Sequence, residues 1–279
     1  MIITDFLERN ARLYGGECAL VEINPSEERD KAVTWWDFNL IESGADAPYR
    51  RELSWKDFDR RANRFANLLL SRGLKKGTKV AVLLMNCLEW LPIYFGILKA
   101  GCVTVPMNYR YSSDEIKYCL DLADVEVLVF GPEFVSRMDA IANEIPNVKM
   151  MFYVGKDGPA YTEDCMALMG FCSSSAPPVA LTEEDHAAIY FSSGTTGFPK
   201  GVVLTNDSVN AVVINFRYCD VVYEDNDRYL GIIPVFSAYG LVCGMHMPLC
   251  LRFTLVPIPK FVPQQLGKLV RDFRPNHII

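Results

Sequence analysis

The sequence has few histidines and no closely paired cysteines, which limits the metal sites that it could form. Only three histidines occur in 279 residues, and none of the nine cysteines belongs to a C-x-x-C pair. Structural zinc sites need such clustered ligands, so we expect no metal site built from the protein's own side chains. Scattered cysteines in a chain of this length are typical of reduced, mostly buried thiols, and they favour a cytoplasmic location.

The sequence also lacks an excess of positive charge and an apolar leader. Its formal net charge is −6 at pH 7, which argues against non-specific binding of nucleic acid. The first ten residues include Asp5, Glu8 and Arg9 and contain no long apolar run. We therefore expect neither a nucleic-acid partner nor a secretory signal peptide.

Charged residues are absent from residues 229–251, and this stretch is long enough to cross a bilayer. Several residues that interrupt helices occur within it, which argues against a membrane span. These residues are Pro234, Pro248, Gly231, Gly240 and Gly244. A buried strand, a loop and a buried helix fit the stretch better, so we expect no stable membrane span.

Alternating strand and helix patterns predict the fold class. Ser54 is a candidate helix N-cap, because Asp57 follows three positions later and apolar residues then recur at helical spacing up to Gly73. We predict an α/β fold whose βαβ units form layered parallel or mixed sheets flanked by helices. After a short N-terminal helix, the expected strands are 18–23, 79–84, 102–106, 125–130, 148–154, 251–258 and 276–279, and the expected helices are 54–73, 89–100, 112–123, 132–144, 205–218 and 263–273.

Two segments show no such periodicity. Residues 24–50 are polar and irregular, and we expect a surface excursion or hairpin there. Residues 172–178 have the composition of a linker. Asp185 and His186 precede an apolar run, and we expect them to cap a turn or helix rather than to act as catalysts.

The most informative stretch is a loop of hydroxyl residues and glycines. Residues 192–200 read Ser-Ser-Gly-Thr-Thr-Gly-Phe-Pro-Lys, and the apolar runs 189–191 and 202–204 beside them predict two buried strands. Glycines let the backbone approach a ligand, exposed N–H groups attract anions, and Lys200 adds a positive charge. The loop contains no acidic residue, so we favour a phosphate site over a polar surface hairpin.

This loop differs from the Walker A loop of P-loop nucleotidases. That motif needs adjacent Gly and Lys followed by Ser or Thr at the start of a helix. Here Phe198 and Pro199 separate Gly197 from Lys200, and Gly201 follows. Pro199 lacks a backbone donor and opposes a helix at this point, so a GTPase-like or kinase-like mechanism is disfavoured.

Residues 192–201, Ser-Ser-Gly-Thr-Thr-Gly-Phe-Pro-Lys-Gly, closely resemble the signature loop of the AMP-forming adenylating enzymes. That family includes acyl-CoA synthetases, aryl-CoA ligases, luciferases and the adenylation domains of peptide synthetases. The resemblance implies the fold of the large N-terminal domain of acyl-CoA synthetases. The residues that it assigns to ATP are Ser192, Ser193, Gly194, Thr195, Thr196, Gly197, Phe198, Pro199 and Lys200. Of these, Thr195 and Lys200 are the candidates for catalysis.

Residues 98–106 resemble a second signature of the same family. By itself this stretch is a helix that ends at a C-cap glycine, Gly101, and leads into a buried strand. We expect Lys99 to be exposed and to take no part in chemistry. For Arg110, in the loop that follows, we favour a solvated side chain over a ligand contact.

Residues 232–240 resemble a third family signature, which often reads Pro-x-Phe-His with the histidine near the acyl adenylate. Ser237 stands at the histidine position. Because serine cannot present an imidazole, a role that depends on this histidine is not carried over. Ser237, Tyr239 and Gly240 are our candidates for the acyl pocket, and plain packing roles for Tyr239 and Gly240 remain equally open.

The resemblance implies ATP-dependent activation of a carboxylic acid, fatty or aryl, to an acyl adenylate. Transfer to coenzyme A would follow, with release of AMP and pyrophosphate. The implied cofactors and partners are ATP, Mg²⁺, coenzyme A and the acid. The α-phosphate and the attacking carboxylate are both negative, so catalysis requires charge neutralisation and in-line positioning, and Mg²⁺ contributes to the neutralisation.

Further parts that the resemblance implies would lie beyond the last residue. They are the adenine and ribose motifs, a magnesium-linked glutamate, and a lysine in a C-terminal lid domain. We therefore expect residues 1–279 to be the N-terminal part of the adenylation domain, incomplete at its C-terminal end and inactive alone. Two alternatives remain open: an adenylating enzyme that loads a carrier protein, and a non-catalytic nucleotide-binding relative.

Overall fold

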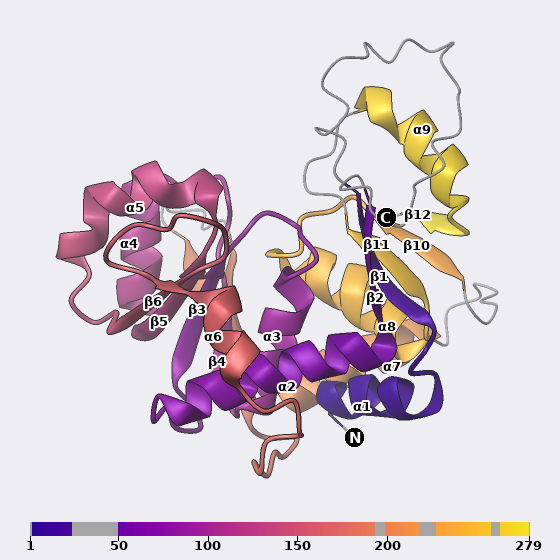
Figure 1. The fold of residues 1–279 in the computed structure, drawn as a ribbon, viewed down its shortest axis with the longest axis horizontal. Coiled ribbons are helices and arrows are strands. Elements are labelled where there is room, and N and C mark those ends of the chain that lie inside the picture. Colours follow the sequence, from indigo (N-terminus) through magenta and orange to yellow (C-terminus); the bar gives the residue numbers. More distant parts are fainter. Residues whose placement is uncertain (1, 24–49, 193–198, 218–226, 258–262, 279) are drawn as a thin grey trace.

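The protein contains two β-sheets that pack around shared helices (Figure 1). The computed structural model describes residues 2–23, 50–192, 199–217, 227–257 and 263–278. The excursion predicted at 24–50 lies almost entirely outside these ranges. The predicted α/β class with parallel or mixed sheets is confirmed, because each sheet pairs parallel strands and carries one antiparallel pair.

The larger sheet has seven strands in the order β7-β6-β5-β3-β4-β8-β9. All neighbours are parallel except β8 and β9. The strands are β3 (Lys79–Leu83), β4 (Val103–Pro106), β5 (Val125–Phe130), β6 (Met150–Tyr153), β7 (Glu163–Asp164), β8 (His186–Ser192) and β9 (Lys200–Thr205).

The smaller sheet has five strands in the order β12-β10-β11-β1-β2, and only β1 and β2 pair in antiparallel fashion. Its strands are β1 (Cys18–Ile23), β2 (Arg50–Ser54), β10 (Arg228–Gly231), β11 (Thr254–Pro257) and β12 (His277–Ile278). Strands from both ends of the described chain meet here, since β1 lies beside β11.

Helices cover both faces of the larger sheet. On β3, Val80 and Val82 belong to the core beneath α2 and α3, whereas Ala81 and Leu83 face the core beneath α4 and α5. Burial on both faces explains why the strand is continuously apolar from Val80 onward. The helices are α1 (Ile3–Leu13), α2 (Trp55–Ser71), α3 (Trp90–Lys99), α4 (Ser113–Leu122), α5 (Val135–Ile141), α6 (Cys165–Phe171), α7 (Asn206–Arg217), α8 (Met247–Cys250) and α9 (Pro263–Phe273), with 3₁₀ turns η2 (Pro132–Phe134) and η3 (Ala142–Glu144) and the π-helix η4 (Tyr239–His246).

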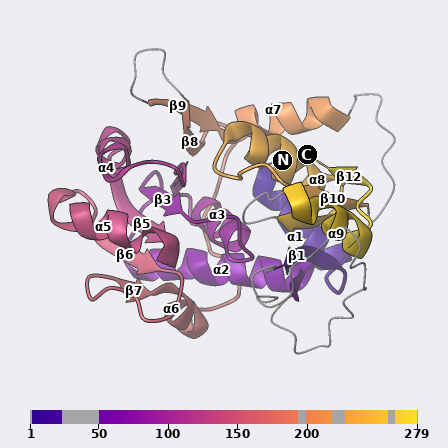
Figure 2. The same ribbon diagram turned by 90° about the horizontal axis from the view of Figure 1, so that it is seen from above.

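Helix α3 lies centrally between the two sheets (Figures 1 and 2). All ten of its residues are buried, as expected for a helix that is apolar all round. Its core cluster joins Val82 of the larger sheet to Leu20 and Leu255 of the smaller one. The two sheets therefore share one hydrophobic core.

Local signals in the sequence account for the helix ends. The hydroxyl of Ser54 accepts a hydrogen bond from the amide of Asp57 at 3.1 Å, which confirms the predicted N-cap of α2. Ser112 and Glu115 form a capping box at the start of α4. Gly101 has a φ of +72°, so the predicted glycine cap that follows α3 is also confirmed.

Two sequence expectations were wrong. Lys99 is 3% exposed rather than solvated. The second strand of the hairpin, β9, was expected to be buried, yet Val202 and Val203 are 47% and 50% exposed because β9 is the edge of the sheet. The sequence pattern predicts no element for residues 165–171, which form α6, and Asp164 caps this helix by accepting from the amide of Ala167.

The uncharged stretch 229–251 contains β10, the π-helix η4 and α8, which confirms the predicted strand, loop and helix. None of the helices in the described ranges combines the length and the apolar character that a membrane crossing needs. Residues 172–178 form no helix or strand, in agreement with the predicted linker. Asp185 accepts a hydrogen bond from the amide of Thr182 at 2.7 Å, which confirms its capping role.

Candidate functional site

The candidate site lies where the parallel strands of the larger sheet end. Strands β3, β4 and β8 run parallel, so their carboxyl ends share one edge of the sheet. In open α/β sheets, ligands bind outside this edge. The predicted phosphate loop follows β8 directly and therefore begins at this edge.

The two ends of the phosphate loop are held together by the β8–β9 hairpin. Ser192 pairs with Lys200 across the antiparallel strands, and the hydroxyl of Ser192 donates to the carbonyl oxygen of Lys200 at 3.4 Å. Pro199 is buried, while Lys200 is exposed. The other predicted loop residues lie outside the described ranges; they are Ser193, Gly194, Thr195, Thr196, Gly197 and Phe198. Their assignment to ATP stays a prediction.

The loop after β4 adds aromatic and cationic side chains at the same edge. Arg110 is exposed, and its guanidinium lies 5.3 Å from the ring centre of Tyr109. The ring of Phe236 also packs against Tyr109. The two rings meet edge-on, with their centres 5.3 Å apart. The segment 232–240 is thus brought against the carboxyl edge, and the expectation of a solvated Arg110 is confirmed.

Asn86, which follows β3, attaches this segment to the larger sheet. Its side-chain amide donates to the carbonyl of Ile233 at 3.3 Å, and its side-chain oxygen accepts from the amide of Val235 at 3.1 Å. Sequence reasoning did not find Asn86. The available signal was its position, because a polar residue directly after a buried parallel strand lies at the ligand edge.

Ser237 uses its hydroxyl within its own segment. The hydroxyl donates to the carbonyl of Pro234 at 2.9 Å and accepts from the amide of Gly240 at 3.0 Å. It therefore acts as a cap where η4 begins. Its place in the acyl pocket stays a prediction. An acid that binds this hydroxyl must either preserve its two hydrogen bonds or take the place of one of the partners.

The other two pocket candidates, Tyr239 and Gly240, begin the π-helix η4. Tyr239 is 54% exposed, so its ring is open to solvent on this side of the molecule. Gly240 is buried, and a Cβ atom there would lie 2.1 Å from the carbonyl oxygen of Pro234. Close packing requires glycine at this position, whatever its relation to a pocket. π-Helical turns occur frequently at functional sites.

The last residue of η4, His246, is buried in aromatic surroundings. Its ring centre lies 5.4 Å from that of Tyr94 and 6.0 Å from that of Phe95. Among the described residues, neither of its ring nitrogens has a hydrogen-bond partner. Burial lowers the pKa of His246 to about 3, so the imidazole is neutral near pH 7.

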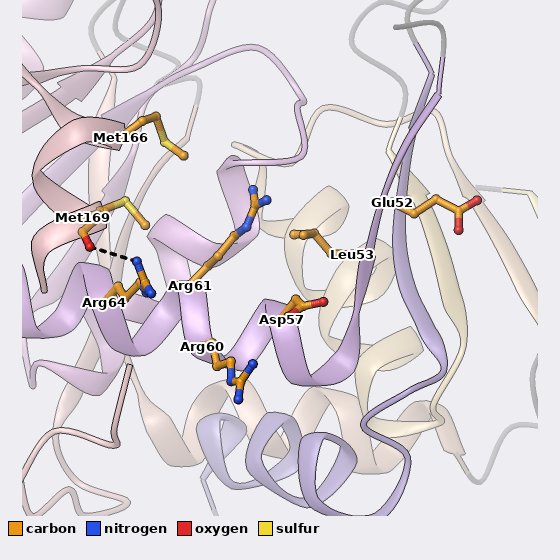
Figure 3. Close-up of a pocket in the computed structure, with 9 residues that line it drawn as sticks. Glu52, Leu53, Asp57, Arg60, Arg61, Arg64, Met166 and Met169 are labelled. Atoms are coloured by element: carbon orange, nitrogen blue, oxygen red, sulfur yellow. Dashed lines mark hydrogen bonds between the residues drawn. The ribbon is translucent and has the colours of Figure 1, made fainter. Parts of the chain in front are cut away.

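A cavity of about 420 Å³ lies along α2, and none of the candidate site residues described above lines it (Figure 3). Its lining residues are Glu52, Leu53, Asp57, Arg60, Arg61, Arg64, Met166, Met169 and Gly170. Arg60 and Arg61 extend in opposite directions from the helix, and Arg64 donates to the carbonyl of Gly170 at 3.1 Å. Because the cations do not converge and two carboxylates accompany them, we assign no ligand to this groove.

Metal-binding clusters of protein side chains are absent from the part of the chain that the structure describes, since no three His, Cys, Asp or Glu residues group together there. Cys102, Cys119 and Cys165 are buried free thiols. Burial raises the pKa of Cys102 and of Cys119 to about 12. These buried thiols are therefore protonated near neutral pH and do not act as nucleophiles.

Comparison with known proteins finds one matching family model and several similar ligases. The family model described as AMP-binding enzyme matches residues 28–279. The long-chain-fatty-acid–CoA ligase of Bacillus subtilis (strain 168) is 29% identical over 257 residues, which cover 82% of this chain and 45% of that protein. The 4-hydroxybenzoate–CoA/benzoate–CoA ligase of Rhodopseudomonas palustris is 27% identical over 240 residues, covering 85% and 44%.

A solved structure shows the same fold. The anthranilate CoA ligase AuaEII, in complex with anthranoyl-AMP, matches with a TM-score of 0.86 at 21% identity, over 100% of this chain and 49% of that one. At this identity the likeness concerns the fold alone. The chain spans less than half the length of the curated ligases that it matches.

Proposed function

Because this chain belongs to the AMP-binding enzyme family, we propose that the whole protein activates a fatty or aryl carboxylic acid with ATP. The product is an acyl adenylate, and the acyl group then passes to coenzyme A with release of AMP and pyrophosphate. The match of the family model over residues 28–279 carries this proposal. The names of the similar ligases, which act on fatty and aromatic acids, support the acid classes.

The chemistry requires an anion to attack an anion. A carboxylate oxygen of the acid forms a bond to the α-phosphorus of ATP, and the bond to the pyrophosphate oxygen breaks. We assign Lys200 and Thr195, with the other loop hydroxyls and amides, to the phosphates of ATP, where positive charge and donors favour this transfer. Ser192 and Lys200 pair across β8 and β9 at the carboxyl end of β8, and this position of the two residues supports the assignment.

Mg²⁺ fits this assignment as an ion carried by ATP. It keeps several waters and binds mainly through substrate phosphates and one or two carboxylates, so it needs no cluster of three side chains. When bound, Mg²⁺ neutralises phosphate charge. Among described residues, the hydroxyl of Ser192, which directly precedes residue 193, is a suitable neighbour for such an ion, and we assign no protein carboxylate to it.

The proposed reaction requires more protein than these residues. We propose that residues 1–279 are the N-terminal part of an adenylation domain, and that the nucleotide-base motifs, a magnesium-linked glutamate and a C-terminal lid domain lie elsewhere in the whole protein. The chain's coverage of less than half of its relatives supports this division. On this proposal the isolated chain is inactive. The cytoplasm remains the proposed location, in keeping with cysteines that are scattered along the chain and form no C-x-x-C pair.

Two alternatives lead to different products. The first alternative is an adenylating enzyme that passes its acyl group to a carrier protein rather than to coenzyme A. A non-catalytic relative would bind the nucleotide only, and the internal use of the Ser237 hydroxyl is the observation that favours it.

Carboxylate-dependent ATP–pyrophosphate exchange by the whole protein tests the proposal. The acids should include short, medium and long fatty acids and several aromatic acids, followed by an assay for the coenzyme A thioester. We expect exchange with one acid class, and a loss of about 100-fold in Lys200→Ala. The exposed Lys149 provides the matched control, and Lys149→Ala should leave exchange unchanged.

ATP binding without exchange for any acid would contradict the proposal and favour the non-catalytic relative. Exchange without a coenzyme A thioester, together with acylation of a carrier protein, would favour the adenylating enzyme that loads a carrier protein.

A further inference from the structure

We propose that Asn86 is a positioning residue that sets the place of residues 233–240 and, through them, the shape of the pocket for the acid. The part of this inference that concerns the acid depends on the proposed function. Asn86 follows β3 of the larger sheet, whereas residues 233–240 follow β10 of the smaller sheet. Its side chain therefore joins two sheets at the candidate site.

The contact engages both ends of the side-chain amide. The nitrogen donates to the carbonyl of Ile233 and the oxygen accepts from the amide of Val235, at 3.3 and 3.1 Å. Asn86 is 3% exposed and Val235 is 2% exposed. Removal of the side chain therefore leaves the buried amide of Val235 and the half-buried carbonyl of Ile233 without these partners.

The two bonds are made by the residues before and after Pro234. The carbonyl oxygen of Pro234 is in turn the acceptor for Ser237. It accepts from the amide of Ser237 at 3.2 Å and from the hydroxyl of the same residue at 2.9 Å. Gly240 packs so closely on this oxygen that a Cβ atom would lie 2.1 Å from it. Fixing Pro234 therefore fixes Ser237, Gly240 and the start of η4.

A series of direct contacts thus connects the candidate pocket residues to Asn86, which follows β3. Tyr239 lies between Ser237 and Gly240, both of which contact Pro234, and Phe236 packs against Tyr109 on the loop after β4. A shift of this segment relative to the sheet would change the distance between acid and phosphate loop. Rates of bimolecular steps depend steeply on such placement.

Asn63 provides a matched control for this inference. It is also 3% exposed and also hydrogen-bonded, since it donates to Asp59 and to the carbonyl of Ser174 and accepts from the ammonium of Lys99. It lies on α2, away from the candidate site. Asn63→Ala therefore removes a comparable buried amide without touching residues 233–240.

Hydrogen–deuterium exchange of the whole protein tests the positioning directly. In Asn86→Ala, the amides of residues 235–241 should exchange about tenfold faster or more, because the segment opens locally. In Asn63→Ala, exchange of these amides should match the wild type. The inference is overturned if both variants leave residues 235–241 as protected as they are in the wild type.

Kinetics of the whole protein then separate positioning from a structural role. Asn86→Ala should raise the KM for the acid about tenfold and alter the preference among acids, with the KM for ATP within about twofold. Equal changes in both KM values, or the same changes in Asn63→Ala, would refute a role in shaping the acid pocket. If the wild type activates no acid, the proposed function fails, and hydrogen exchange alone decides whether Asn86 positions the segment.

Discussion

A single buried lysine joins three helices of this protein. The ammonium of Lys99, at the end of α3, lies 2.8 Å from Glu8 of α1 and 2.7 and 2.9 Å from Asp59 and Asn63 of α2. A buried charge is tolerated only when it is paired and hydrogen-bonded, and all three donors of this ammonium are engaged.

Removing this charge should destabilise the fold. Lys99→Met keeps an unbranched apolar side chain but removes the ammonium that donates to Asp59 and Asn63, and we expect a loss of about 2–4 kcal/mol in the free energy of unfolding. Denaturant unfolding measures it. Lys149→Met breaks an exposed pair with Glu126 and should cost less than about 1 kcal/mol. Equal losses in the two variants would contradict the assigned burial of Lys99.

His246 should make stability depend on pH. Its pKa is about 3 in the folded protein against a reference value of 6.5, so the unfolded chain binds the proton more readily. Above pH 6.5 the residue has no effect on the pH dependence, and stability is lost as the pH falls from 6.5 toward 3. Between pH 7 and 5 we expect this residue to account for about 2 kcal/mol.

Denaturant unfolding at several pH values, compared with His246→Leu, isolates this contribution. The variant should show a flatter decline between pH 6.5 and 5, whatever its stability at pH 7. Parallel curves for the two proteins would mean that the imidazole is not buried as described.

At the scale of the elements, the start of η4 depends on a glycine. Gly240→Ala would place a Cβ atom 2.1 Å from a backbone oxygen, and backbone cannot move aside as a side chain does. We expect a loss of about 2–3 kcal/mol in stability and a fall in adenylation by the whole protein.

A glycine in an open helix provides the control. In α9, a Cβ atom on Gly267 would meet nothing within 4 Å, so Gly267→Ala should raise stability by about 0.5–1 kcal/mol. Thermal unfolding of the two variants measures both effects. A neutral Gly240→Ala would show that the contact with Pro234 is looser than described.

The hairpin of β8 and β9 forms the outer element of the larger sheet. Among the described strands, β9 pairs with β8 alone, and the exposure of Val202 and Val203 follows from that edge position. The edge location leaves Lys200 exposed beside the loop. A flexible cation open to solvent suits the capture of a polyphosphate, which is consistent with the proposed ATP site.

At the scale of the whole molecule, the two sheets share one core. Leu20 of the smaller sheet and Val82 of the larger sheet belong to the same buried cluster, with α3 between them. We therefore predict that Leu20→Ala lowers the protection of amides in β3 as much as in β11, by about 2–5 kcal/mol.

Native-state hydrogen exchange measures this coupling between the sheets. Leu122 is 51% exposed, and Leu122→Ala should leave both strands unchanged. Loss of protection in β11 alone would show that the sheets unfold independently.

Much of the fold follows from local signals in the sequence. Ser54 begins α2 by accepting from the amide of its neighbour Asp57, and Gly101 ends α3 with a positive φ. The alternation of strands and helices reflects which faces are buried. The family could be recognised from residues 192–201, because a phosphate loop requires small residues and hydroxyls in a fixed order.

The sequence by itself thus determined the α/β class, most element boundaries and the family. The tertiary structure alone decided which polar side chains are buried and what they bind. The partners of Lys99 lie as many as 91 residues away in the chain, and those of Asn86 lie 147 and 149 residues away. Because such contacts depend on how the sheets and helices pack, no local pattern distinguishes a buried Lys99 or Asn86 from a solvated one.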